Sequence, residues 1–364
     1  MAAAAEAQTV LRYDAVEGWP APEERGEWFG DPQAERTLLD AYRSGRMHHA
    51  WLIGGPKGIG KATLAYRFAR LLLAHPDPAA PDVAAATDLS VPADHPAFRK
   101  VAGRAHPNLL VLERPYDQRA NRYKSALTVE EIRRTVSFYG TTGGEAGWRI
   151  AIVDPADDMN VSAANALLKV LEEPPSRSLF LVVSHAPGRA LPTIRSRCRR
   201  LDLAPLAETA IVSALTAGGD EGEPEDLALA ARLSDGSLRR AILLADGGGI
   251  DSYRAFAGLL SRLPEIDVAA AHDFADSVTG RGNEDGWTGF VDMTAAWLNR
   301  RVRGESEPET GIPLSPAAAS APLERWAEVW ENLRASSALT DEYNLDRKRT
   351  VLTVLMTLAR ATRM

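Results

Sequence analysis

The sequence predicts an α/β fold followed by an all-α region, and three observations carry this prediction. Over roughly the first 200 residues, short apolar runs alternate with segments whose apolar residues recur at helical spacing. Two runs, 149–154 (RIAIVD) and 179–184 (LFLVVS), are almost uninterrupted, which is typical of parallel strands covered on both faces. After about residue 205 only helical patterns continue. Strands that alternate with helices indicate a parallel sheet with right-handed crossovers.

The first predicted elements surround a glycine-rich loop. A helix is expected over 30–46, with Asp31 as N-cap and Pro32 at the first helical position. A buried strand over 50–54 leads into the loop, and a helix over 61–74 follows it. Residues 75–96 are rich in Pro, Ala and Asp, so we expect an irregular insertion there.

The α/β part then continues to about residue 204. A strand over 108–113 precedes a helix with a Thr128 N-cap and Glu131 at the capping-box position. The helical pattern in 162–175 is stopped by Pro174 and Pro175. Together with the two apolar runs, these elements define a predicted first domain over 1–204.

Two helical domains are expected after it, over 205–249 and 250–364. The smaller one contains helical patterns in 208–219 and 224–245 and ends near Gly247–Gly249. In the larger one a loop rich in Pro, Ser and Ala is expected over 303–323, before helical patterns in 325–335 and 347–361.

Composition excludes several classes of protein. The 364 residues are 45% hydrophobic and 25% charged, and no apolar run is long enough to span a membrane. The N-terminus has neither a basic start nor a long apolar stretch, so we expect no secretory signal and a cytoplasmic protein. One cysteine excludes disulfides within the chain and a multi-cysteine zinc site. The net charge of −7 provides no global attraction to nucleic acid.

Residues 54–64 (GGPKGIGKATL) match the phosphate-loop pattern except at one position. Such a loop points backbone N–H groups at phosphates from the positive end of a helix, and its lysine adds a charge beside them. The hydroxyl residue that would hold Mg²⁺ is replaced by Ala62. Thr63 lies about 100° further round the helix and cannot take over.

A second catalytic position is also lost. The apolar run 149–154 ends in Asp154, which can hold a metal through water, but the residue after it is Pro155. Proline cannot accept a proton from an attacking water. We therefore expect a phosphate-loop fold without turnover, in which weak nucleotide binding remains open.

Arginines dominate residues 191–201 (LPTIRSRCRRL). They form either a solvated basic stretch or an arginine finger that reaches a neighbour's γ-phosphate. Cys198 lies inside the stretch with no base near it in the sequence, so we interpret it as a packing residue. Arg239, in 236–241 (GSLRRA), could contact a nucleotide held between modules or be solvated like most helical arginines.

Taken together, these motifs resemble those of AAA+ clamp-loader subunits, most closely the delta-prime family of the bacterial DNA polymerase III clamp loader. The resemblance rests on residues 44–65, 153–175, 191–201, 236–242 and 344–348, which follow the family's order over nearly the whole chain. It implies a AAA+ domain, a small helical lid and a C-terminal helical collar that holds the subunit in a ring with one delta and three gamma/tau subunits.

The resemblance also implies roles for individual residues. Gly55, Gly58, Gly60 and Lys61 match the phosphate loop, and Asp154 matches the metal-site aspartate. Ser184 matches the polar sensor, with His185 as the competing assignment. Arg239 matches the sensor arginine of the lid. Arg197 matches the arginine that acts in trans on the ATP of an adjacent motor subunit.

Partners and cofactors follow from the same resemblance. We expect gamma/tau and delta subunits as direct partners, the sliding clamp and primed DNA as partners through the complex, and no membrane. The chain would be a subunit of the polymerase III holoenzyme without ATPase activity of its own, requiring no cofactor and binding ATP or ADP weakly at most. Many relatives carry four zinc-binding cysteines where this chain has none, and His75, His95 and His106 are too few to replace them, so we expect no zinc.

Two other functions compete with this one. An active gamma/tau-like ATPase would need a magnesium ligand and a water-activating acid, which the motifs lack. An unrelated phosphate-loop enzyme, such as a small-molecule kinase, would leave the arginine stretch and the helical C-terminus without a function. Arg195, Arg197, Arg199 and Arg200 could contact DNA phosphates, but the acidic net charge opposes strong binding by the chain alone.

Overall fold

The computed structural model describes residues 15–16, 18–119, 122–140, 147–219, 222–246, 248–280, 284–303 and 315–363. The chain divides into two compact units. The first contains residues up to 219 together with 235–239, and the second contains residues 220–234 and those from 240 onward. Part of the predicted lid, 205–249, thus belongs to each unit, and the proposed three-domain division stays a prediction.

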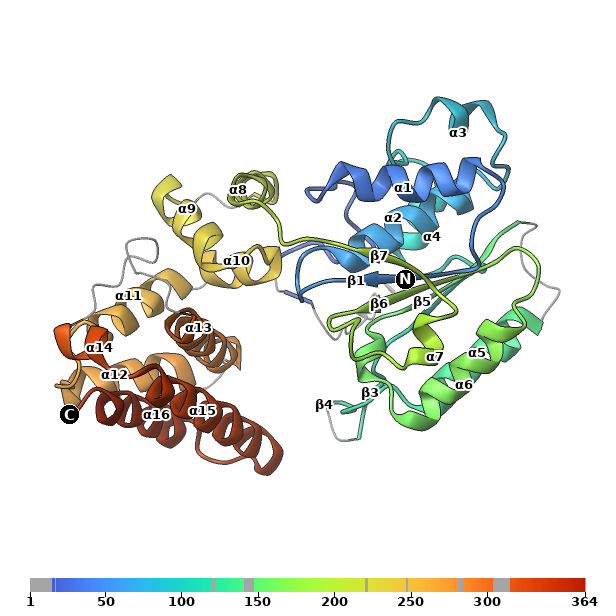
Figure 1. The fold of residues 1–364 in the computed structure, drawn as a ribbon. Helices are drawn as coiled ribbons and strands as arrows, with labels where there is room; N and C mark the ends of the chain where they lie inside the picture. Colours follow the sequence, from blue (N-terminus) through green and yellow to red (C-terminus); the bar gives the residue numbers. More distant parts are fainter. Residues whose placement is uncertain are drawn as a thin grey trace, which may run out of the picture. The chain divides into compact units, whose positions relative to one another are not determined.

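A five-stranded parallel sheet with the order β2-β5-β6-β1-β7 forms the centre of the first unit. The sheet and its helices confirm the predicted fold class (Figure 1). The strands are β1 (Ala50–Gly54), β2 (Leu109–Leu112), β5 (Arg149–Val153), β6 (Ser178–Ser184) and β7 (Arg199–Asp202). The helices are α1 (Pro32–Arg43), α2 (Lys61–Ala74), α3 (Pro81–Ala85), α4 (Pro96–Ala102), α5 (Val129–Gly140), α6 (Val161–Glu172), α7 (Pro192–Arg195) and α8 (Glu208–Ala217).

Both faces of this sheet are covered, which explains the uninterrupted apolar runs. In β6, Leu181 and Val183 join the core formed with α1, α2 and α4, whereas Phe180 and Val182 join the core formed with α5, α6 and α7. Successive strand residues point to opposite faces, so a strand buried on both sides must be apolar throughout.

Several boundaries match the expectations from the sequence. The Asp31 side chain caps α1 by accepting a hydrogen bond from the N–H of Gln33 at 2.8 Å. Helix α5 begins at Val129, directly after Thr128, and α6 ends two residues before Pro174. The glycine-rich loop lies between β1 and α2, as predicted.

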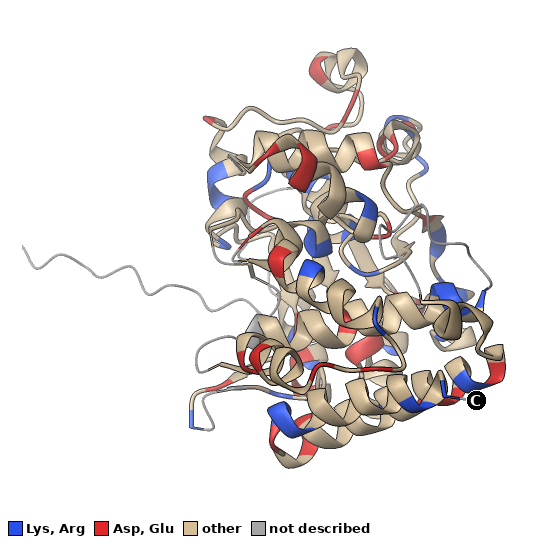
Figure 2. Cartoon of the chain, turned by 90° about the vertical axis from the view of Figure 1, so that its left-hand side faces the viewer, with Lys and Arg blue, Asp and Glu red and all other residues tan. Residues whose placement is uncertain are grey.

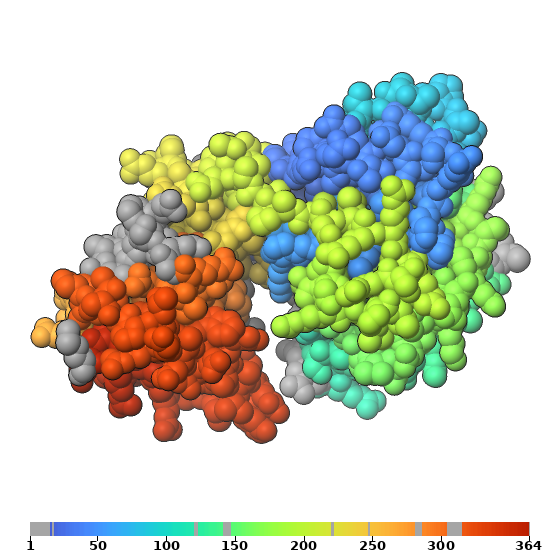
Figure 3. All heavy atoms as spheres, viewed as in Figure 1, coloured from blue at the N-terminus to red at the C-terminus, as the bar shows by residue number. Residues whose placement is uncertain are grey.

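Other elements were not foreseen. The insertion over 75–96 is not wholly irregular, because it contains the short helix α3, and the Arg43 guanidinium donates to the carbonyl oxygens of Val83 at 2.8 Å and Ala84 at 3.1 Å. Helix α4 begins at the last residue of the insertion, Pro96. Strands β3 (Tyr116–Asp117) and β4 (Arg122–Tyr123) form a hairpin. The basic segment 199–202 forms strand β7 beside β1, so residues around 200 lie against N-terminal segments (Figure 3).

The second unit is helical. Its elements are α9 (Pro224–Leu233), most of α10 (Leu238–Ala245), α11 (Gly249–Leu260), α12 (Val268–Thr279), α13 (Glu284–Val302), α14 (Pro316–Ser320), α15 (Leu323–Tyr343) and α16 (Arg347–Ala361). Short helix α14 falls in the expected loop. A core rich in aromatic residues joins these helices, with Phe290 in contact with Phe256, Phe274 and Trp287.

Charged residues of both signs are spread over the described helices (Figure 2). Within the described part of the chain, no helix is both long and apolar enough to cross a membrane.

Candidate nucleotide loop and arginine finger

The glycine-rich loop begins at the carboxyl end of β1, which lies between β6 and β7. In parallel α/β sheets the crevice outside this edge is where ligands bind. Gly55, Gly58 and Gly60 have φ values of +139°, +80° and +95°. Side chains rarely tolerate this left-handed region, so the three predicted glycines are needed for the backbone path.

At two of these glycines, close neighbours also leave no room for a side chain. A Cβ atom at Gly55 would lie 2.5 Å from the Leu203 carbonyl oxygen. At Gly58 it would lie 2.9 Å from the Cβ of Arg239. The structure thus brings Gly58 and Arg239 together, and the Arg239 N–H donates to the Gly58 carbonyl at 3.2 Å. Two predicted site residues that are 181 positions apart in the chain therefore meet at the loop.

Lys61 lies at the start of α2, with only 3% of its surface exposed. Its Nζ donates to the carbonyl of Pro56 within the same loop. The next residue, Ala62, packs its methyl group against the core, and the Thr63 side chain is buried. Neither residue therefore offers a hydroxyl ligand at the position where a phosphate loop holds Mg²⁺.

Asp154 and Ser184 stand at the ends of neighbouring strands. The Asp154 N–H donates to the Leu112 carbonyl at 2.9 Å, and Pro155 follows it. The β1–β6 register places Ser184 opposite Gly54, beside the loop. The predicted aspartate and sensor thus lie at the same edge of the sheet as the phosphate loop.

The sequence did not single out Asp157, which holds the end of β6. Its carboxylate accepts hydrogen bonds from the Ser184 Oγ at 3.1 Å, the His185 N–H at 2.6 Å and the Ala186 N–H at 3.0 Å. Two residues that compete for the sensor assignment therefore contact the same carboxylate. In the sequence, the two consecutive aspartates 157 and 158 after Pro155 were the only signal for a carboxylate at this position.

Arg197 lies after α7, away from the glycines of the loop in sequence, and its side chain is 34% exposed. One guanidinium nitrogen is 2.7 Å from the Glu172 carboxylate, at the end of α6. Another donates to the Thr193 carbonyl at 3.1 Å. The predicted arginine finger is thus partly exposed and held by its own subunit.

The other arginines of this stretch also have partners within the chain. Arg195 donates to the Gly188 carbonyl at 3.1 Å, Arg200 lies 2.6 Å from the Asp202 carboxylate, and Arg199 stacks over Trp51 at 4.7 Å from the ring centroid. Each arginine of this stretch thus has a partner within the chain, although Arg195, Arg199 and Arg200 are exposed to solvent. Cys198 is buried in the core, which confirms its packing role, and burial raises its thiol pKa to about 12.

Two of the histidines that were considered as zinc ligands, His95 and His106, have structural partners. The Nδ1 of His95 accepts from the Ala97 N–H at 3.1 Å and caps α4, and the Nδ1 of His106 accepts from the Asn108 N–H at 3.1 Å. Among the described residues there is no group of three or more His, Cys, Asp or Glu side chains that could hold a metal ion. The expectation that the chain needs no zinc stays a prediction.

Residues 30–207 match the family model described as DNA polymerase III, delta subunit. The chain is 38% identical over 150 residues to the DNA polymerase III subunit delta' of Pseudomonas aeruginosa, covering 41% of each chain. It is 32% identical over 225 residues to the Escherichia coli subunit delta', covering 60% of each. It is 27% identical to the Bacillus subtilis subunit tau over 65% of this chain and 39% of tau.

The chain thus spans less than two thirds of the length of these relatives. Among solved structures, a gamma subunit-related protein of Thermotoga maritima is 18% identical with a TM-score of 0.47, over 90% of this chain and 99% of that one. Residues 30–207, which carry the phosphate loop, the strand ends and the arginine stretch, therefore resemble the delta' subunits of DNA polymerase III.

Proposed function

We propose that this chain is a non-motor subunit of a DNA polymerase III clamp loader that supplies Arg197 to an ATP bound by a neighbouring gamma/tau subunit. One observation carries the proposal: the phosphate loop keeps its shape while Ala62 and Pro155 replace the magnesium ligand and the water-activating acid. A chain with this combination can brace an assembly without hydrolysing ATP itself. The partly exposed Arg197 is the group it can offer to a neighbour.

The proposed partners are gamma/tau and delta subunits, with the sliding clamp and primed DNA engaged through the complex. The chain would need no cofactor and no zinc. Its loop would bind ATP or ADP weakly, if at all, and without turnover, because no side chain at positions 62 and 155 can ligate Mg²⁺ or accept a proton.

Arg197→Ala should leave assembly intact and lower the ATPase of the reconstituted complex. An arginine finger contributes about 10³–10⁵ in rate at the site it serves, so the complex should lose most of the turnover at one of its ATP sites. The measurement is ATPase of the complex with clamp and primed DNA, with Arg189→Ala, another exposed arginine, as control. Unchanged ATPase in a fully assembled Arg197→Ala complex would contradict the role.

An active gamma/tau-like ATPase is the second candidate, favoured by the similarity to subunit tau, which extends over 241 residues. It predicts Mg²⁺-dependent turnover by the isolated chain that Lys61→Ala abolishes. Absence of turnover in the isolated chain, together with normal activity of a Lys61→Ala complex, would exclude it.

A further inference from the structure

Two adjacent histidines, His48 and His49, lie directly before β1 in the first unit. Their imidazole rings stack, with centroids 4.5 Å apart and planes inclined by 25°. The backbone carbonyl of His49 accepts a hydrogen bond from the Phe180 N–H of β6 at 2.8 Å. The stacked ring and the bonded carbonyl together fix the position of His49.

The ring of His49 contacts the end of α6, although the two are 122 positions apart in the chain. Its Nε2 lies 3.1 Å from the carbonyl oxygen of Leu171. A carbonyl oxygen can only accept, so Nε2 carries the proton in this contact. Burial, and then the neighbouring His48, lower the pKa of His49 below its ordinary value, so the ring is neutral near pH 7 and donates this N–H.

The sequence after α6 explains why this carbonyl needs a donor from a side chain. The last carbonyls of a helix have no partner within it, and the N–H groups of the two residues after the C-cap commonly close them. The C-cap of α6 is Glu173, and the next two residues are Pro174 and Pro175, which have no N–H. In the usual motif the first of these two residues would donate to the Leu171 carbonyl. The His49 ring thus supplies the donor that Pro174 lacks.

The turn that His49 caps is also the turn that contacts Arg197. Glu172 is the last residue of α6 and directly follows Leu171, and its carboxylate lies 2.7 Å from the Arg197 guanidinium. The side chain of Leu171 is buried in the core on this face of the sheet. If its carbonyl lost the donor, the last turn would fray and the Glu172 carboxylate would move relative to Arg197.

We propose that His49 is a positioning residue for the arginine finger. Its ring fixes the last turn of α6, and this turn fixes the carboxylate that orients the Arg197 guanidinium. Two hydrogen bonds and one peptide bond connect the ring of His49 to Arg197 through Leu171 and Glu172. The inference rests on the proposed function, because the finger is part of that proposal.

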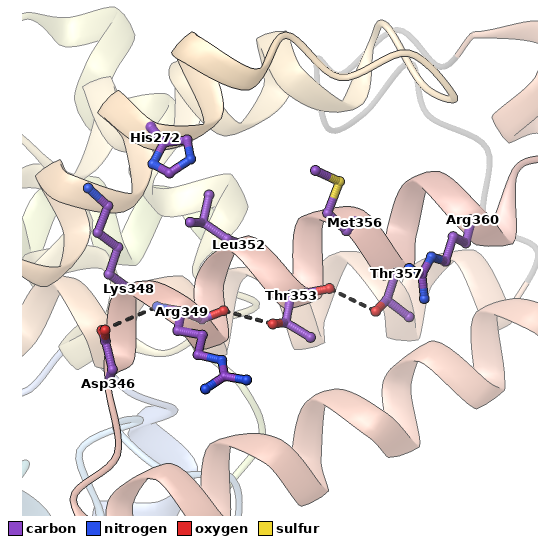
Figure 4. A pocket seen from close by; sticks show the side chains of 9 residues that line it. All are labelled: His272, Asp346, Lys348, Arg349, Leu352, Thr353, Met356, Thr357 and Arg360. Atoms are coloured by element: carbon purple, nitrogen blue, oxygen red, sulfur yellow. Dashed lines mark hydrogen bonds between the residues drawn. The ribbon is translucent and has the colours of Figure 1, made fainter.

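The test uses the full-length chain reconstituted with gamma/tau and delta subunits of the same organism. His49→Leu removes the donor and should lower kcat for ATP hydrolysis about two- to fivefold, with little change in KM, because the exposed pair that it positions is weak. His49→Gln keeps an N–H that can reach the same carbonyl and should restore most of kcat. The control is His272→Leu, because His272 is exposed on α12 of the second unit, where it borders a groove formed with α16 (Figure 4). Its kcat should equal that of the wild type.

A double-mutant cycle distinguishes positioning from a general structural effect. In a Glu172→Gln background, His49→Leu should have no further effect on kcat. An equal loss in both backgrounds would show that His49 does not act through Glu172. A loss in His49→Gln as large as in His49→Leu would show that the hydrogen bond is not the cause. Either result would overturn the inference.

Hydrogen exchange of the isolated chain tests the cap without the complex. His49→Leu should speed amide exchange in the last turn of α6 about two- to tenfold, as expected for the loss of one hydrogen bond. Unchanged exchange would mean that His49 does not cap α6, and the inference would be wrong.

The Arg197→Ala complex separates this inference from the proposed function. If Arg197→Ala leaves the ATPase of the complex unchanged, the proposed function fails and the positioning role fails with it. If Arg197→Ala lowers the ATPase but His49→Leu does not, the proposed function stands and only the role of His49 is wrong.

Discussion

At the scale of single residues, the proposed function depends on two catalytic groups that the chain lacks and on one arginine that it keeps. Ala62 and Pro155 remove a metal ligand and a proton acceptor, and no neighbouring hydroxyl replaces the former because Thr63 is buried. Arg197 remains, but its guanidinium contacts Glu172 at 2.7 Å and the Thr193 carbonyl at 3.1 Å. Both ionic groups are partly exposed, so the pair is weak and a γ-phosphate with several charges can displace it.

In the proposed role of Arg197 as an arginine finger, Glu172 would orient its guanidinium group and still release it to a phosphate. Glu172→Gln should lower kcat for ATP hydrolysis by the reconstituted complex, with little change in KM, because Arg197 would sample more rotamers. The effect should not exceed about fivefold, since exposed pairs contribute about 0.2–1 kcal/mol. The measurement is steady-state ATPase in the presence of clamp and primed DNA.

Glu173→Gln is the matched control, because Glu173 is also exposed and adjacent in sequence, and no ion pair to it is found among the described residues. A double-mutant cycle distinguishes positioning from a structural effect. In an Arg197→Ala background, Glu172→Gln should have no further effect on kcat. An equal loss in both backgrounds would show that Glu172 does not act through Arg197.

At the scale of elements, a buried ion pair between Arg67 and Glu35 joins α2 to α1. Arg67 on α2 and Glu35 on α1 form an ion pair at 2.8 Å, and the two side chains are only 4% and 6% exposed. The same carboxylate accepts from the Leu89 N–H of the insertion at 3.4 Å. One carboxylate thus links α1, α2 and the insertion after α2.

Glu35→Ala should destabilise the first unit by about 3–5 kcal/mol, because it leaves the Arg67 charge buried without its partner. Urea unfolding followed by circular dichroism measures this loss of free energy of unfolding. Arg36→Ala, at the neighbouring exposed position of α1, should change it by no more than about 0.5 kcal/mol. Similar values for the two variants would mean that the ion pair does not stabilise the unit.

At the scale of the whole molecule, each unit has hydrophobic cores of its own. The two cores of the first unit lie on opposite faces of the sheet, and the aromatic core of the second unit joins α11 to α16. This division separates the chemistry proposed for the loop and Arg197, in the first unit, from the helical core of the second unit. Substitutions in one unit are therefore expected to leave the local structure of the other intact.

Phe290→Ala tests this separation, since Phe290 is 1% exposed and contacts two phenylalanines and a tryptophan of the helical core. It should destabilise the second unit by about 3–5 kcal/mol. Native-state hydrogen exchange should show faster exchange in α13 and α15, with unchanged protection in β1, β5 and β6. Equal loss of protection in the sheet would mean that the two units unfold together.

Much of this molecule could be predicted from local sequence patterns. Apolar runs and caps are local properties, so four of the five strands of the sheet and the starts of α1 and α5 were located correctly. Strand β7 was missed because Arg199 and Arg200 carry no apolar pattern, and only pairing with β1 makes 199–202 a strand. Helix α3 was missed because a segment rich in Pro and Asp was expected to be irregular, and α4 lies almost wholly beyond that segment, where no element was predicted.

The sequence by itself determined which chemical groups the chain has: a loop with Gly55, Gly58 and Gly60, no hydroxyl at position 62, no acid at position 155, and an arginine at position 197. Residue identity is enough for these conclusions, because a methyl group or a proline ring cannot ligate or accept a proton in any fold. Only the tertiary structure decided which distant groups meet: Arg239 at Gly58, Asp157 at Ser184, and Glu172 at Arg197. Those contacts depend on strand order and crossovers, which bring together residues that no local pattern connects.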